Sequence, residues 1–171
     1  MISAGGEYRI ETFENALLAK GEDDATHKAL FAQDEIGIGD ALTLTAGLRW
    51  DHHEYFGSEV SPRIYAVYDL TDSLTLKGGY GHGFKAPTLK QISPDYAFHG
   101  PHTFYGNADL KPEVNDSYEI GIQYKNSDTS ASLTLFRNDI DDLIGYDCIA
   151  NCMAPFGKEF LYVNVDKART Q

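Results

Sequence analysis

The feature that most constrains the fold is a strict alternation of apolar and polar residues between positions 42 and 51. The apolar positions are Leu42, Leu44, Ala46, Leu48 and Trp50, and the positions between them are Thr43, Thr45, Gly47, Arg49 and Asp51. Successive side chains of a β-strand point to opposite faces, so this segment has one apolar and one polar face. About ten residues also suffice for a tilted strand to cross a bilayer.

The same alternation recurs along the chain, and no segment shows a sustained helical period. Further examples lie at residues 74–83, 118–125, 132–135 and 161–166. The alternation at 63–70 is blurred by Tyr65 and Val67, and weaker strands lie at 2–13 and 28–38. The sequence therefore predicts an all-β chain of about eight strands. If the chain crosses a membrane, the faces of Leu48, Trp50 and Leu76 point outward, whereas a soluble β-sandwich would bury them.

The connections between the predicted strands alternate in length. Tight turns fall near 39–40, 71–73 and 126–128, where Gly, Asp and Asn favour sharp reversals. The alternate connections are longer, at roughly 14–27, 52–60, 85–116 and 145–160. Transmembrane β-barrels have short periplasmic turns and long extracellular loops, so the pattern favours an antiparallel membrane barrel.

Composition excludes some classes of protein. Acidic residues outnumber basic ones 26 to 14 and give a net charge of −12, so we expect no nucleic-acid partner. No run approaches the ~18 apolar residues of a transmembrane helix. The 11 Tyr, 9 Phe and 16 Gly residues suit β-structure with aromatic rings at the membrane interface.

The two cysteines, Cys148 and Cys152, are separated by three residues. This spacing fits neither a Cys-x-x-Cys redox motif nor a four-ligand zinc site. We expect a small disulfide in an exposed loop, which requires an oxidising compartment. The alternative is a pair of free thiols.

Eight stretches resemble, in their order along the chain, the barrel of one known family. They are Ala29–Glu35, Leu44–Asp51, Ser61–Arg63, Gly83–Leu89, Gly106–Glu113, Tyr118–Gly121, Phe136–Ile144 and Tyr162–Arg169. The family is that of TonB-dependent outer-membrane receptors. Ser61–Arg63, Lys85–Pro87 and Ser93–Tyr96 look most similar to its catecholate siderophore and colicin I receptor branch.

The resemblance implies a bacterial outer-membrane location and a 22-stranded barrel that encloses a plug domain. Residues 1–171 would form part of that barrel, without the plug, the TonB box or a signal peptide. The implied partners are outer-membrane lipid, a ferric siderophore, TonB through the plug, and colicins or phages. We expect the eight strands to form one curved antiparallel sheet with two open edges, not a small closed barrel.

The longest predicted loop, 85–116, carries the candidate ligand-binding residues. They are Lys85, Lys90, Tyr96, Phe98, His99, His102, Phe104 and Tyr105. Aromatic rings stack on a flat siderophore, and cations meet its negative charge. Alternatively, the rings pack the loop against itself or belong to the interfacial aromatic belt.

Other chemistries receive less support from the sequence. His52 and His53 point to opposite faces of a strand, so they cannot easily share one metal ion. His99 and His102 lie in a loop and could share one. The implied ligand brings its iron already chelated, so we expect no metal site in the protein. No nucleophile, base and acid occur together, so we expect neither an enzyme nor a cofactor. The alternatives are uptake of haem, cobalamin or a glycan, a soluble all-β binding module, and an outer-membrane enzyme.

Overall fold

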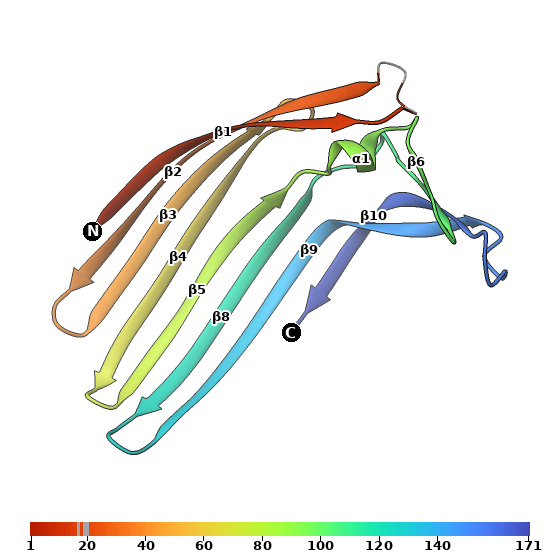
Figure 1. Ribbon diagram of the computed structural model, residues 1–171. Helices are drawn as coiled ribbons and strands as arrows, with labels where there is room; N and C mark the ends of the chain where they lie inside the picture. The colour runs from red at the N-terminus through yellow and green to blue at the C-terminus, as the bar shows by residue number, and fades with distance from the viewer. Residues whose placement is uncertain (17, 19–20) are drawn as a thin grey trace.

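The computed structural model describes residues 1–171 except 17, 19 and 20, and its long strands lie side by side in one curved sheet (Figure 1). The eight long strands are β1 (Ile2–Glu14), β2 (Glu22–Ile38), β3 (Leu42–His53), β4 (Gly57–Thr71), β5 (Leu74–Lys85), β8 (Glu113–Lys125), β9 (Ser130–Ala150) and β10 (Glu159–Thr170). Each pairs antiparallel with the next, in sequence order. The sheet does not close on itself, which confirms the predicted open section of a barrel.

The three tight turns lie at one end of the sheet, hereafter the short-turn end. The predicted connections at the opposite, long-loop end were too long. The connection 52–60 has only residues 54–56 outside strands, and β9 continues to Ala150. The connection 14–27 was also overestimated because β2 begins at Glu22, and residues 17, 19 and 20 lie outside the described part. Polar strand ends still pair through their backbones, so the apolar alternation ends before the strands do.

The long connection between β5 and β8 contains elements that the sequence did not predict. It forms α1 (Leu89–Ile92), β6 (Ala97–His99) and β7 (Thr103–Tyr105). β7 pairs parallel with the start of β10, so the sheet has ten strands and is not wholly antiparallel. Strands of three residues are too short to show a period in sequence.

The register of the sheet defines two faces. The inner face, which carries Arg49, Asp51 and Glu119, is the one on which the long connection lies. The outer face carries Leu48, Ile120 and Leu135, which are 54%, 63% and 64% exposed. Trp50 shares this face, so the apolar face points outward as predicted.

The buried residues lie between the long connection and the inner face. The most buried apolar side chains are Ala25, Ala29, Pro87, Leu89, Tyr96 and Leu110. Ala25 and Ala29 belong to β2, and the other four belong to the connection. In the described part of the chain, no helix is long and apolar enough to span a membrane.

Gly79 on β5 provides a test of how closely the sheet wall is packed. Its neighbour Tyr65 crosses it to donate a hydrogen bond to Glu119 at 2.9 Å. A Cβ at Gly79 would collide with the Tyr65 ring and lie 2.5 Å from the Ile64 carbonyl oxygen. We expect Gly79→Ala to lower the free energy of unfolding by about 1–3 kcal/mol.

The matched control for this prediction is Gly81→Ala, on the same strand and face. The nearest atom to a Cβ at Gly81 is the Arg63 Cγ, 4.0 Å away. We expect no loss of stability from Gly81→Ala, and denaturant unfolding of the intact protein in detergent compares the two variants. Equal losses would show that the contacts around Gly79 are not the cause.

Candidate ligand-binding surface

The long connection, residues 86–112, is anchored first to β1. The Leu89 backbone N–H donates to Glu11 Oε1 at 3.2 Å, and the Tyr96 ring meets Phe13 edge-on at 5.2 Å. Thr88 and Gln91 form a capping box that starts α1 and presents Leu89 to the strands. This anchor explains why Leu89 is only 1% exposed.

A second anchor joins the connection to the opposite side of the sheet. Phe104 stacks on Phe160 with ring centroids 5.0 Å apart, and Tyr146 meets both rings edge-on. The Tyr105 hydroxyl donates to Glu159 at 3.1 Å, and this hydrogen bond, together with burial, raises the pKa of the phenol. The connection therefore spans the inner face from β1 to β10.

The return of the connection into β8 is fixed by polar contacts. Lys85 Nζ lies 2.9 Å from Glu113 Oε2, and the Ile144 N–H donates to the other oxygen of Glu113 at 2.8 Å. Asn164 accepts from the Lys111 N–H and donates to the Lys111 carbonyl oxygen. Both ends of the connection are thus held to the strands of the sheet.

The eight predicted ligand-binding residues divide into two groups in this arrangement. Lys90, Phe98 and His99 lie together at the long-loop end, with Phe98 48% exposed and the Lys90 Nζ 5.5 and 5.4 Å from the Tyr96 and Phe98 ring centroids. The other five belong to the anchors. They are Lys85, Tyr96, His102, Phe104 and Tyr105.

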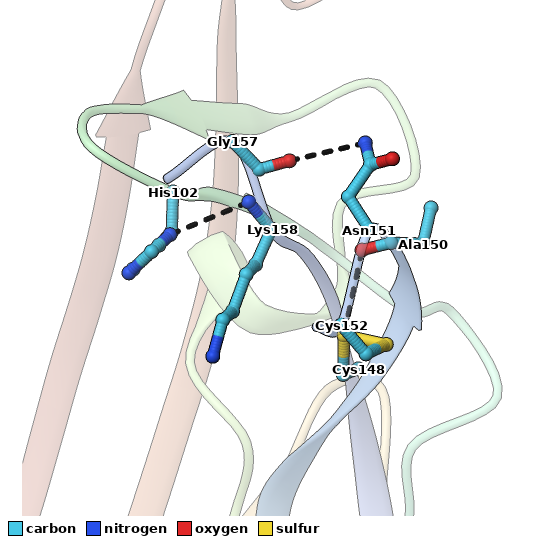
Figure 2. Close-up of a disulfide and its surroundings, with 7 residues drawn as sticks. All are labelled: His102, Cys148, Ala150, Asn151, Cys152, Gly157 and Lys158. Carbon is cyan, nitrogen blue, oxygen red and sulfur yellow. Dashed lines mark hydrogen bonds between the residues drawn. A yellow bond between two sulfur atoms is a disulfide. The ribbon is translucent and has the colours of Figure 1, made fainter. Parts of the chain in front are cut away.

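The two loop histidines have separate partners. His99 lies 3.4 Å from the Thr103 hydroxyl, whereas His102 packs edge-on against Phe160 and accepts the Lys158 N–H (Figure 2). No group of three or more His, Cys, Asp or Glu side chains suited to a metal ion occurs among the residues that the structure describes.

The tip of the β9–β10 hairpin is closed by a disulfide between Cys148 and Cys152, whose Cα atoms are 5.7 Å apart (Figure 2). The Asn151 side chain donates to the Gly157 carbonyl oxygen at 3.2 Å. On this tip, Met153 is fully exposed and Phe156 is 74% exposed. The disulfide therefore constrains an apolar tip at the long-loop end.

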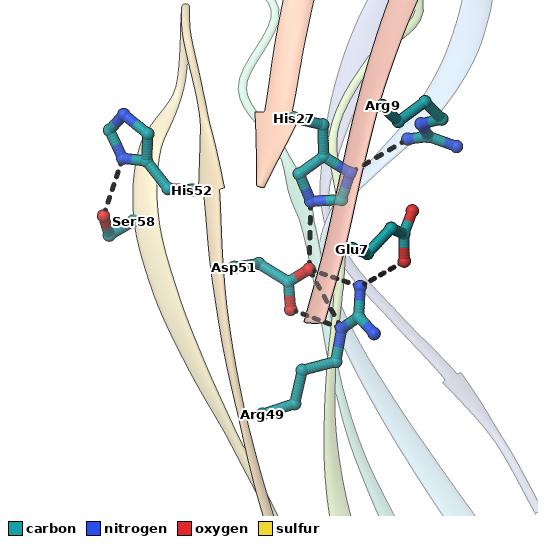
Figure 3. Close-up of polar contacts among 7 residues, drawn as sticks. All are labelled: Glu7, Arg9, His27, Arg49, Asp51, His52 and Ser58. Atoms are coloured by element: carbon teal, nitrogen blue, oxygen red, sulfur yellow. Dashed lines mark hydrogen bonds and ion pairs between the residues drawn. The ribbon is translucent and has the colours of Figure 1, made fainter. Parts of the chain in front are cut away.

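The inner face of β1–β3 carries a charge network that the sequence did not reveal (Figure 3). Arg49 donates to both oxygens of Asp51, at 3.0 and 2.9 Å, and to Glu7 at 3.0 Å. His27 lies 2.9 Å from Asp51 and 3.1 Å from the Arg9 guanidinium. A guanidinium cannot accept, so the His27 Nδ1 accepts from Arg9 and Nε2–H donates to Asp51.

A cleft of about 510 Å³ lies between α1 and the long-loop ends of β2 and β3. Its lining includes Tyr55, Phe56, Glu22, Asp23 and Asp95. The three carboxylates give it the wrong sign for an anionic ligand. Burial, followed by a hydrogen bond to Asp23, raises the pKa of the Tyr55 hydroxyl.

An outward apolar face, a polar inner face and a long inward-folded connection define a section of an outer-membrane β-barrel. The chain matches the model of the "TonB dependent receptor-like, beta-barrel" family over residues 3–171. It belongs to this family, whose members are transport receptors, and it is an outer-membrane protein.

Individual relatives agree with the family assignment. The iron-regulated outer membrane virulence protein of Vibrio cholerae is 38% identical over 99% of this chain and 28% of its own length. The ferric enterobactin receptor of Pseudomonas aeruginosa is 40% identical over 68% of the chain and 17% of its own length. The crystal structure of the siderophore receptor PirA from the same organism superposes with a TM-score of 0.88 at 30% identity, covering 98% of this chain and 34% of PirA. The chain thus spans about a third or less of the length of each.

Proposed function

We propose that this chain forms part of a TonB-dependent receptor that imports a ferric siderophore, with a catecholate as the preferred ligand class. The proposal is supported by the relatives named for ferric enterobactin and by the siderophore receptor whose structure superposes on this chain. Energy would come from TonB through a plug domain, and no enzymatic step is required. We also propose that colicins or phages bind to the same surface.

The observation that carries the proposal is the position of Lys90. The connection 86–112 is fixed at both sides of the sheet and holds this ammonium within 5.5 Å of two ring centroids, Tyr96 and Phe98. Phe98 keeps an open surface on which a flat catecholate can stack. The ammonium supplies positive charge next to it, as an anionic iron complex requires.

The function is tested by the affinity of the intact protein for ferric enterobactin in detergent. We expect Lys90→Ala and Phe98→Ala each to weaken binding about two- to thirtyfold, since cation–π and stacking contacts contribute about 0.5–2 kcal/mol. The measurement is quenching of protein fluorescence during titration.

Lys125→Ala serves as the matched control, because Lys125 carries the same charge at the short-turn end of β8. Its affinity should equal that of the unmodified protein. If the Lys90 and Phe98 variants also keep full affinity, the ligand contacts a different part of the receptor.

A further inference from the structure

On four strands, the apolar run that starts at the short-turn end of the outer face is interrupted by a polar or charged side chain. Towards the long-loop end, Trp50 is followed by His52 on β3, and Tyr80 by His82 on β5. In the same direction on the outer face, Tyr118 is followed by Asp116 on β8, and Leu135 is followed by Arg137 on β9. Aromatic belts mark the interface of a membrane barrel, and a lipid-facing charge near the midplane costs about 2–4 kcal/mol. The hydrocarbon region therefore ends at these polar positions, which mark its boundary.

Just above the boundary, β9 and β10 present two arginines joined by one carboxylate. Asp139 accepts from the Arg137 Nε at 2.7 Å and from the Arg169 Nε at 2.6 Å. The arginine side chains remain 49% and 56% exposed. The shared carboxylate fixes both guanidinium groups side by side on the outer face.

Unused donors remain in this cluster. Each guanidinium has five N–H groups, and Arg169 contacts Asp139 only through Nε. Its two terminal nitrogens have no acceptor within the part of the chain that the structure describes. Two positive charges against one negative charge leave the cluster with a net charge of +1.

The neighbouring carboxylates are engaged elsewhere. Asp116 accepts from the Tyr80 hydroxyl at 2.6 Å and lies 2.9 Å from His82. Asp141 stands opposite Lys167 in the β9–β10 register, so their charges offset each other. Asp116 stands opposite Asp139 in the β8–β9 register, so the patch formed by Arg137, Asp139 and Arg169 offers an anion two exposed guanidinium groups and not a large excess of positive charge.

We propose that Arg137 and Arg169 bind the phosphorylated headgroup of an outer-leaflet lipid. Guanidinium groups recognise phosphate by paired, charge-assisted hydrogen bonds. Directly below the patch, the exposed side chains of Ile120 and Leu135 form an apolar surface for acyl chains. A lipid, unlike a free anion, satisfies both halves of the site. The inference depends on the outer-membrane location and not on the identity of the imported ligand.

The test measures binding of diphosphoryl lipid A and of its dephosphorylated form to the intact protein in detergent, by native mass spectrometry. We expect the phosphorylated lipid to be preferred, and the double variant Arg137→Gln/Arg169→Gln to bind it at least about tenfold more weakly. Arg63→Gln removes the same charge from the inner face and should leave lipid binding unchanged.

A second variant guards against misfolding. Arg137→Lys/Arg169→Lys keeps both charges and should retain clearly more lipid binding than the glutamine variant, with the folded form of each checked by its gel mobility without heating. Three results would overturn the proposal: equal binding of the two lipid forms, equal losses in the lysine and glutamine variants, or binding of inorganic phosphate as tight as that of the lipid.

Discussion

Replacement of Asp51 by alanine is expected to lower the free energy of unfolding by about 3 kcal/mol. Asp51 is only 5% exposed and is the common acceptor for Arg49 and His27. Its removal leaves two donors on the inner face without their acceptor. The value is set at the lower end of the range for broken buried ion pairs because Arg49 keeps Glu7 and is partly exposed.

The measurement is denaturant unfolding of the intact protein in detergent. Asp69→Ala is the matched control, since Asp69 is exposed on the same face and accepts one hydrogen bond, from Thr75. We expect it to cost about 0.5–1 kcal/mol. Comparable losses in the two variants would mean that the network adds nothing beyond a single surface hydrogen bond.

Replacement of Leu89 by alanine is expected to reduce the free energy with which the long connection docks on the sheet by about 2–5 kcal/mol. Leu89 is 1% exposed and lies where α1 meets β1 and β2. A cavity there weakens the β1 anchor, whereas the aromatic anchor at β10 persists. Residues 86–100 should therefore become sensitive to protease while the long strands stay folded.

Limited proteolysis of the intact protein, read by mass spectrometry, measures this release. Leu135→Ala removes the same atoms from the outer face and should leave cleavage of the connection unchanged. Ferric enterobactin affinity should fall with Leu89→Ala, because the Lys90 position depends on α1. A protected connection in the variant would show that its β10 anchor alone holds it in place.

The long strands were predictable because a sheet with lipid on one side imposes a period of two. That period lies in neighbouring residues, as at Leu42–Trp50, and needs no knowledge of distant contacts. Strand ends were predicted less well. Residues 22–27 and 145–150 extend their strands beyond the apolar region, where backbone pairing continues without an apolar pattern.

The candidate site was predictable as a segment but not as an arrangement. The residue types of 85–116 identified a loop rich in rings and cations. Only the structure shows that Phe104 and Tyr105 anchor it, whereas Lys90 and Phe98 remain available. The partners responsible, Phe160 and Glu159, lie more than fifty positions further along the chain.

The sequence by itself determined the class of this protein: its strands, the two unlike faces of the sheet, and the alternation of short and long connections. All three follow from local patterns of polarity and turn residues. Tertiary structure alone decided the course of the connection across the inner face, the Asp51 network and the bridging of Arg137 and Arg169 by Asp139. Each joins residues from different strands, and the register that brings them together is a property of the assembled sheet.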